Sequence, residues 1–231
     1  MSLKRVVVAI DGPAGAGKST LARRIAGRLG YLYIDTGAMY RAVALWAERT
    51  GTAIDEALKL EQLARAAAIE LKSNPLSVTL NGEDVTEAIR RPEMSQAASK
   101  ASAIPGVRRA LVEKQRQMGE QNSIVMEGRD IGTVVFPDAT IKIFLDAAPE
   151  VRARRRLEEM MAKGQSQLTF DAVLKDINER DYRDRNRSEA PLMQAPDAEY
   201  IDSSANTIEE VEERLLALVR LRTSNGREVA K

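Results

Sequence analysis

A glycine-rich segment near the amino terminus carries the clearest chemical signature of the chain. Residues 12–19 read Gly-Pro-Ala-Gly-Ala-Gly-Lys-Ser, which fills the P-loop pattern Gly-x-x-x-x-Gly-Lys-Ser. Its glycines let backbone N–H groups turn toward a phosphate chain, while Lys18 reaches the outer phosphates and Ser19 ligates Mg²⁺. The segment therefore predicts a nucleoside triphosphate site, built from Gly12, Pro13, Ala14, Gly15, Ala16, Gly17, Lys18, Ser19 and Thr20.

Arginines gather in two clusters in the last third of the chain. One cluster is Arg152, Arg154, Arg155 and Arg156, and the other is Arg180, Arg183, Arg185 and Arg187. Most charge runs are solvated helix faces with surface ion pairs, and that interpretation applies here too. Beside a P-loop a second interpretation is favoured, because transfer between two nucleotides requires cations between their phosphates. Arginine suits this role because it pairs bidentately with phosphate oxygens.

A possible second substrate site begins at Asp35-Thr-Gly-Ala-Met-Tyr-Arg41. Thr36 offers a hydroxyl and Arg41 a cation one turn into a helix, which suits one sugar and one phosphate. The alternative is an ordinary helix start in which Asp35 or Thr36 caps the first turn.

Another polar segment, Glu127-Gly-Arg-Asp130, follows a predicted strand. Arg129 is placed to hold an acceptor phosphate. An ionised Asp130 only accepts hydrogen bonds, so it would accept from the N4 amino group of cytosine and repel the carbonyl that uracil carries there. The alternative is a structural salt bridge in a turn at the end of the strand.

The elements that must position these residues alternate between strand and helix patterns. Apolar runs predict strands at residues 6–10, 31–35, 123–127, 141–146 and 200–202. Helical patterns cover residues 38–49, 54–68, 105–119, 149–163, 170–184 and 208–221. The alternation predicts an α/β fold of three layers, with a doubly wound parallel sheet of about five strands. Such sheets bind ligands at the carboxyl ends of their strands, where the polar segments lie.

Residues 69–91 change character and predict a small antiparallel insert, with a hairpin turn at Asn81-Gly82. We expect a single domain over residues 1–225, with an acceptor-binding region at about 36–105 and a mobile lid at about 152–187. Gly164 is a candidate hinge for that lid, and residues 223–231 are expected to form a disordered tail.

Composition excludes several classes of protein. The 231 residues are 44% hydrophobic and carry a net charge of +1, without cysteine or histidine. Disulfide frameworks, thiolate metal sites and a histidine base are excluded, but phosphoryl transfer tolerates their absence because positioning and electrostatics supply most of its catalysis. The near-neutral charge and the lack of a long apolar run or signal peptide predict a cytoplasmic protein with neither a nucleic acid nor a membrane partner.

Five segments together resemble the bacterial cytidylate kinases. They are residues 12–19, 35–41, 127–138, 142–146 and 179–187, and the likeness extends from about residue 5 to 222. The resemblance implies a nucleoside monophosphate kinase with a core, an acceptor region and a lid. It implies ATP with Mg²⁺ as donor, CMP or dCMP as acceptor, and a monomer.

The resemblance also implies roles for particular residues. The base would meet Ser99, Arg108 and Asp130, the acceptor phosphate Arg41, Arg129 and Arg187, and the ribose Thr36 and Asp184. The catalytic set would be Lys18, Arg129, Arg155, Arg156 and Arg180. Thr36 stands where relatives often carry serine, and it keeps the hydroxyl.

Several other functions share part of this pattern. A P-loop kinase of another small acceptor, such as UMP/CMP, AMP or a coenzyme precursor, would share the P-loop and the lid. A GTPase would carry Asn-Lys-x-Asp and Asp-x-x-Gly, and neither string occurs. A nucleotide-binding module without activity would need no lid, and an RNA-binding protein is disfavoured by the net charge and by an aromatic content of 4%.

Overall fold

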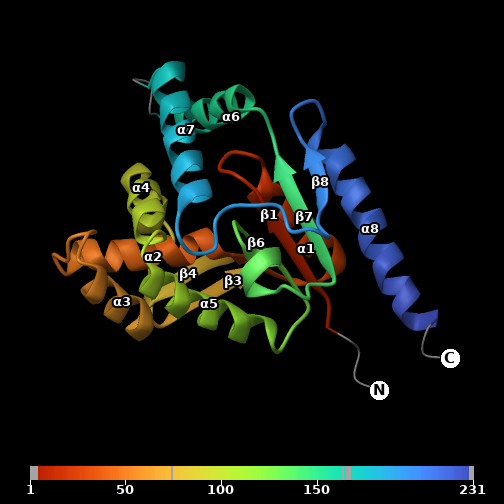
Figure 1. The fold of residues 1–231 in the computed structure, drawn as a ribbon, viewed down its shortest axis with the longest axis horizontal. Helices are drawn as coiled ribbons and strands as arrows, with labels where there is room; N and C mark the ends of the chain where they lie inside the picture. Colours follow the sequence, from red (N-terminus) through yellow and green to blue (C-terminus); the bar gives the residue numbers. More distant parts are fainter. Residues whose placement is uncertain (1–4, 74, 163, 165–167, 229–231) are drawn as a thin grey trace.

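A five-stranded parallel sheet forms the centre of the protein (Figure 1). The computed structural model describes residues 5–228 except 74, 163 and 165–167. The strand order is β2-β6-β1-β7-β8, and the strands are β1 (Val7–Asp11), β2 (Leu32–Asp35), β6 (Ile124–Gly128), β7 (Ile141–Asp146) and β8 (Glu199–Asp202). In this register Asp11 lies beside Gly128, and Asp35 beside Glu127. The carboxyl ends of these strands therefore bring the polar segments to one edge.

Helices cover both faces of the sheet, which confirms the predicted three-layer fold class. Successive strand side chains point to opposite faces. Val8 and Ile10 pack with α1 (Lys18–Leu29) and α8 (Ile208–Glu228), while Ala9 packs on the other side with α5 (Pro105–Gly119). Burial on both faces explains why the strands read as continuous apolar runs.

A second region with its own core precedes α5. Its elements are α2 (Thr36–Arg49), α3 (Ala57–Ala66), β3 (Ile69–Ser73), β4 (Leu76–Leu80), β5 (Glu83–Asp84), η1 (Ala88–Arg90) and α4 (Pro92–Ala101). The three strands form the predicted antiparallel insert, and both Asn81 and Gly82 adopt positive φ angles, 52° and 85°, as a tight hairpin requires. The helix α4 was not predicted, because its Ala- and Ser-rich sequence has no strong apolar stripe.

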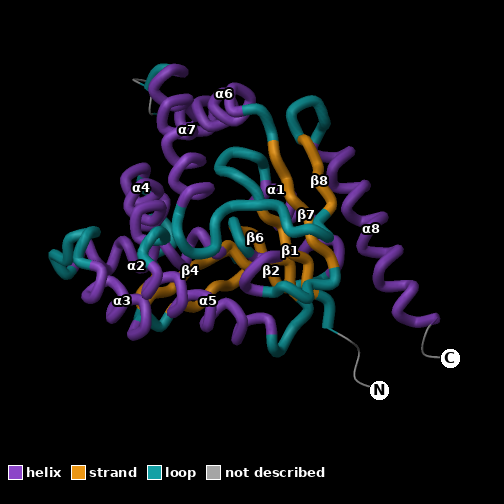
Figure 2. The backbone as a smooth tube through the Cα atoms, in the orientation of Figure 1, coloured by secondary structure: helices purple, strands orange, loops and turns teal. Residues whose placement is uncertain are grey.

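Two helices stand away from the sheet at the end of β7 (Figure 2). These are α6 (Pro149–Ala162) and α7 (Phe170–Asn186), which share a small apolar cluster of Ala153, Val173 and Ile177. Arg152 is fully buried between them, donating to Asp181 Oδ2 at 2.6 Å and to the Ala14 carbonyl at 3.1 Å. This arginine therefore joins the two helices to the P-loop.

The end of the chain differs from the prediction. The closing helix α8 extends to Glu228, so residues 223–228 are helical where a disordered tail was expected, and residues 229–231 lie outside the described residues. Each residue added to an existing helix gains a hydrogen bond without a new nucleation cost, which favours such continuation. Among the helices described, none has the length and apolar character needed to cross a bilayer.

Replacing Arg152 tests whether its ion pair with Asp181 holds α6 against α7. We expect Arg152→Ala to lower the free energy of unfolding by about 3–5 kcal/mol, because Asp181 is left buried without its partner. The matched control is Arg154→Ala on the exposed side of the same helix, with an expected effect within about 0.5 kcal/mol. Urea unfolding measures both, and equal stabilities for the two variants would contradict this role.

Candidate active site

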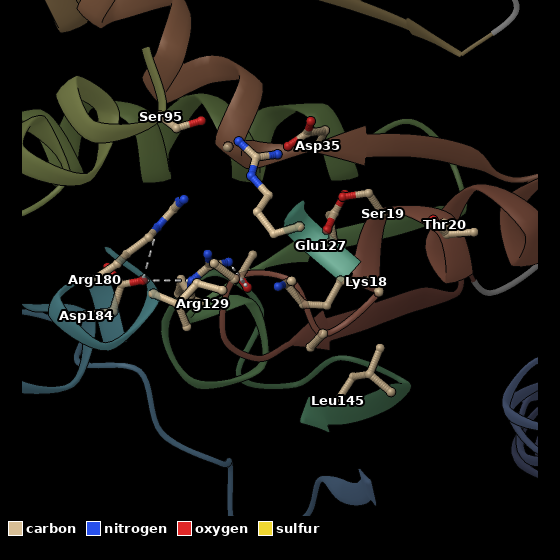
Figure 3. Close-up of a pocket in the computed structure, with 18 of the residues that line it drawn as sticks. Lys18, Ser19, Thr20, Asp35, Ser95, Glu127, Arg129, Leu145, Arg180 and Asp184 are labelled. Atoms are coloured by element: carbon tan, nitrogen blue, oxygen red, sulfur yellow. Dashed lines mark hydrogen bonds and ion pairs between the residues drawn. The ribbon is translucent and has the colours of Figure 1, made fainter. Parts of the chain in front are cut away.

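One cavity of about 640 Å³ opens at the carboxyl ends of the strands, between the sheet, α4 and the two helices α6 and α7 (Figure 3). Eighteen of the twenty residues predicted for the site line it, and the exceptions are Gly12 and Pro13. Segments far apart in the sequence therefore meet in one place. The predicted nucleotide loop and the predicted second substrate site face the same space.

The P-loop adopts the backbone that its glycines allow. Gly12 has a φ of 146°, and a Cβ there would lie 1.9 Å from the Leu145 carbonyl oxygen, so only glycine fits against β7. Gly17, with a φ of 92°, leads directly into α1. The first turn of that helix thus presents its N–H groups to the cavity, which is a favourable place for phosphate.

Lys18 lies buried at the floor of the cavity. Its ammonium group donates to the Pro13 carbonyl at 2.6 Å. Burial, and next the nearby Arg129 guanidinium, lower the pKa of Lys18 to about 7. A phosphate chain in the loop would supply the negative charge that this amine requires.

Glu127 is the main residue for which the sequence analysis gave no individual role. It ends in the cavity beside Ser19 (Figure 3), and its Oε1 accepts from the Tyr33 hydroxyl at 2.6 Å. Burial and the neighbouring Asp35 raise the pKa of this carboxyl, while Lys18 and the Ser19 hydroxyl oppose the rise. Carboxylate and hydroxyl oxygens are the hard ligands that Mg²⁺ prefers. The sequence did contain a signal for Glu127, because this carboxylate stands at the end of a predicted buried strand.

The segment after β2 contains the helix cap that the sequence analysis offered as the alternative. Asp35 caps α2, because its Oδ1 accepts from the Ala38 N–H at 3.0 Å, and its Oδ2 accepts from Arg41 at 2.8 Å. Burial raises the pKa of Asp35, but Arg41 and the Ala38 N–H outweigh it and hold the pKa below its usual value. Thr36 donates its hydroxyl proton to the Glu127 carbonyl at 2.7 Å, which leaves its oxygen free to accept.

Asp184 on α7 holds two arginines in the cavity (Figure 3). Its Oδ2 accepts from Arg129 Nε at 2.9 Å and lies 3.9 Å from Arg180 Nε. Burial acts to raise the pKa of Asp184, but Arg129 and Arg180 hold it below the usual value. Burial and Arg129 in turn lower the pKa of Arg180 to about 10. This carboxylate therefore keeps cations together that would otherwise repel one another.

Asp130 forms a buried ion pair with Arg108, and its other oxygen lies 3.8 Å from Arg187. The salt bridge that the sequence analysis offered as an alternative is therefore present, although Asp130 also lines the cavity. Arg187, which the resemblance assigns to the acceptor phosphate, therefore lies beside Asp130, which the resemblance assigns to the base. Ser99 lies nearby on α4 and lines the same cavity.

A short π-helical turn, η2 (Ile131–Val135), follows Asp130 and was not predicted. Asp11 at the end of β1 fixes this turn, because its two oxygens accept from the Ile131 and Gly132 N–H groups at 2.8 and 2.7 Å. Burial raises the pKa of Asp11 to about 6, against the two N–H groups that lower it. The start of the P-loop segment thus holds the loop that carries Asp130.

Several guanidinium N–H groups in the cavity make no hydrogen bond to the described part of the protein. Among the described residues, Arg108 Nε, Arg180 Nε and Arg187 Nη2 are buried without a hydrogen bond. Arg155 donates to the hydroxyl and carbonyl of Ser203, at 3.1 and 2.7 Å, and Arg156 lies 3.4 Å from Glu159. Buried donors of this kind are costly unless an acceptor arrives, and phosphate oxygens are strong acceptors for arginine.

Comparison with known proteins places this geometry in a family. A family model described as cytidylate kinase matches residues 8–221. The chain belongs to the cytidylate kinase family. It is 60% identical over 226 residues to a cytidylate kinase of Solibacter usitatus (strain Ellin6076), covering 97% of each chain. It is 52% identical over 215 residues to a cytidylate kinase of Pelotomaculum thermopropionicum, covering 92% of this chain and 95% of the relative.

Solved structures show a more distant likeness. An uncharacterized protein from Eubacterium ventriosum superposes with a TM-score of 0.50 at 12% identity, over 92% of this chain and 97% of the other. At this identity the likeness supports the fold alone. Membership of the cytidylate kinase family confirms the family and the class of enzyme predicted from the sequence, a nucleoside monophosphate kinase.

The lowered pKa of Lys18 predicts that nucleotide binding takes up a proton. At pH 8 most of the Lys18 amine is neutral, and the phosphates of Mg·ATP favour its charged form, so binding should draw nearly a whole proton from the buffer. At pH 6 the amine already carries its proton, and this uptake should disappear. Isothermal titration calorimetry in buffers of different ionisation enthalpy measures the proton count.

The control is Lys18→Arg, which stays charged and reports protons that the ligand itself gains or loses. A proton count at pH 8 that is the same in this variant and in the unaltered protein would contradict the prediction.

Proposed function

We propose that this protein transfers the γ-phosphoryl group of ATP to CMP or dCMP, giving ADP and CDP or dCDP. Family membership supports this reaction over the other small acceptors considered above. The observation that carries the proposal is the single cavity, which joins the P-loop to a cluster of Ser99, Arg108 and Asp130. A donor and an acceptor nucleotide would meet between them.

The donor phosphates fit the P-loop side of the cavity. Its N–H groups and Lys18 would hold the β- and γ-phosphates. Beyond the loop, Arg155 and residues of the turn before α8 extend the cavity, which leaves room for the rest of the nucleotide. The residues of that turn and of the start of α8 are Ser203, Asn206, Thr207, Ile208 and Val211.

The residues beside the P-loop fit a magnesium ion. The Ser19 hydroxyl and the Glu127 carboxylate both line the cavity, and both offer oxygen ligands. They would hold Mg²⁺, directly or through water. When bound, the ion supplies positive charge that neutralises phosphate oxygens during transfer.

The acceptor fits the opposite side. Asp130 would accept from the cytosine amino group, with Arg108 fixing the carboxylate that does so. The phosphate of CMP would lie among Arg41, Arg129 and Arg187, and its ribose would meet Thr36 and Asp184. Because Arg41 is tied to Asp35 here, we expect it to exchange one carboxylate oxygen for a phosphate oxygen.

Transfer requires no base from the protein. An oxygen of the CMP phosphate, already ionised, attacks the γ-phosphorus while the bond to the bridging oxygen of ADP breaks. Arg155, Arg156 and Arg180 would neutralise the charge on the transferring group. Closure of the lid, α6 and α7, would exclude water that could otherwise accept the phosphoryl group.

We also propose that the enzyme acts as a monomer in the cytoplasm. Every residue of the proposed site comes from one chain, so a partner subunit is not needed to complete it. ATP and CMP are both metabolites of that compartment.

The proposal is tested by ADP release from Mg·ATP with CMP, dCMP, UMP, AMP, GMP or no acceptor. We expect turnover that strongly prefers CMP and dCMP. Preference for another acceptor would overturn the base assignment, and equal ADP release without any acceptor would identify an ATPase instead.

In the same assay Lys18→Ala should lower kcat by about 10²–10³, because one preorganised electrostatic contact is lost.

Asp130→Asn should reduce the preference for CMP over UMP by about 100-fold, because an amide can donate to the carbonyl of uracil as well as accept. The amide keeps an oxygen for Arg108, so the fold should persist, and a melting curve checks this. The ratio of kcat/KM for CMP and UMP is the measurement. An unaltered ratio in a folded variant would show that Asp130 does not read the base.

A further inference from the structure

Two carbonyl groups of the P-loop accept hydrogen bonds from side chains of distant segments. Arg152 on α6 donates from Nη1 to the Ala14 carbonyl at 3.1 Å, across 138 residues of sequence. The Ser203 hydroxyl, directly after β8, donates to the Ala16 carbonyl at 3.1 Å, across 187 residues. Arg152 and Ser203 are both buried, with exposed fractions of 1% and 6%. Two peptide groups of the loop are therefore tied to other parts of the fold.

Each held carbonyl also sets the direction of the N–H group that follows it. In a planar trans peptide the C=O of one residue and the N–H of the next point in opposite directions. The two held carbonyls therefore turn the N–H groups of Gly15 and Gly17 away from the side chains that hold them. Neither N–H donates to a backbone carbonyl of a described residue, and both glycines line the cavity.

Arg152 is itself held firmly. Its Nε donates to the carbonyl of Ala147, directly after β7, at 2.7 Å, and its Nη2 donates to Asp181 on α7 at 2.6 Å. Its main chain packs on the loop as well, because a Cβ at Gly15 would lie 3.2 Å from the Arg152 carbonyl oxygen. The three nitrogens of one guanidinium thus hold the end of a core strand, α7 and the P-loop in a fixed relation.

We propose that Arg152 and Ser203 are positioning residues that keep the N–H groups of Gly15 and Gly17 turned toward the phosphates of the donor nucleotide. This inference rests on the proposed function. A glycine-rich loop has many backbone conformations available, and a phosphate chain binds only where successive N–H groups face one centre. The two contacts select such a conformation before the nucleotide arrives, which reduces the ordering cost of binding.

Two substitutions remove these contacts while leaving most of their surroundings in place. Ser203→Ala deletes the hydroxyl, and Arg155 keeps its hydrogen bond to the Ser203 carbonyl. Arg152→Lys keeps a positive charge for Asp181, but a single ammonium group lacks the planar fork that reaches three acceptors at once. Arg154→Lys is the matched control, because Arg154 is exposed on the same helix. Melting curves confirm that each variant is folded.

Isothermal titration calorimetry measures the effect with three ligands. CMP is titrated first, and then Mg·ADP and pyrophosphate with Mg²⁺ are each titrated into protein saturated with CMP, so that both report on the P-loop. We expect Arg152→Lys and Ser203→Ala each to weaken Mg·ADP and pyrophosphate about five- to tenfold, which is the scale of one lost hydrogen bond. The affinity for CMP should change less than about twofold, and Arg154→Lys should bind all three ligands like the unaltered protein.

Three results would overturn the inference. One is an unchanged affinity for Mg·ADP and pyrophosphate in either folded variant. A second is a loss for Mg·ADP alone, because pyrophosphate has no base or sugar and such a variant would have lost a contact with those groups instead. A third is an equal weakening of CMP, which would show a general disturbance of the cavity.

The proposed function fails in a different way. If Arg152→Lys and Ser203→Ala bind both phosphate ligands normally while the unaltered protein phosphorylates CMP, the inference fails and the proposed function stands. If the unaltered protein does not bind CMP, the proposed acceptor is wrong, and the titrations of the variants with Mg·ADP still decide the inference.

Discussion

Repulsion between like charges is the constraint on which this structure depends. The cationic side chains that line the cavity are Lys18, Arg41, Arg108, Arg129, Arg155, Arg156, Arg180 and Arg187. At the low effective dielectric of a partly buried site, such charges repel strongly. Asp35, Asp130 and Asp184 are three of the carboxylates that line the same cavity, and each forms an ion pair with one of these arginines. Asp35 lies at the end of β2 and Asp130 just after the end of β6, at one edge of the sheet, and Asp184 comes from α7.

These carboxylates do not form hydrogen bonds with every cationic group in the cavity, and the groups that are left can bind phosphate oxygens. Asp184 pairs closely with Arg129 but leaves Arg180 at 3.9 Å, and the buried Nε of Arg180 has no hydrogen bond within the described residues. Burial lowers the pKa of both Lys18 and Arg180, so holding either group in its charged form in this site carries a free-energy cost. Nucleotide phosphates would lower that cost, and two nucleotides would lower it more than one. In this account, nucleotide binding itself reduces the repulsion between the cationic side chains.

Local patterns in the sequence predicted what local physics determines. Buried parallel strands require continuous apolar runs, and the P-loop requires glycines at fixed spacing, so both were found. The roles of Arg152 and Asp11 were not found, because each depends on a partner distant in the sequence. Arg152 has the same residue type and helix face as Arg155, yet it is buried against Asp181. Only the packing of α6 on α7 distinguishes them.

The central claim is that these cations hold two sets of phosphates in line within one cavity. A crystal structure with CMP and a non-hydrolysable ATP analogue tests it most directly. The account predicts the γ-phosphate at the P-loop and Lys18, with the CMP phosphate among Arg41, Arg129 and Arg187 and one of its oxygens facing the γ-phosphorus. A CMP phosphate bound away from these arginines, or a nucleotide base far from Asp130, would contradict it.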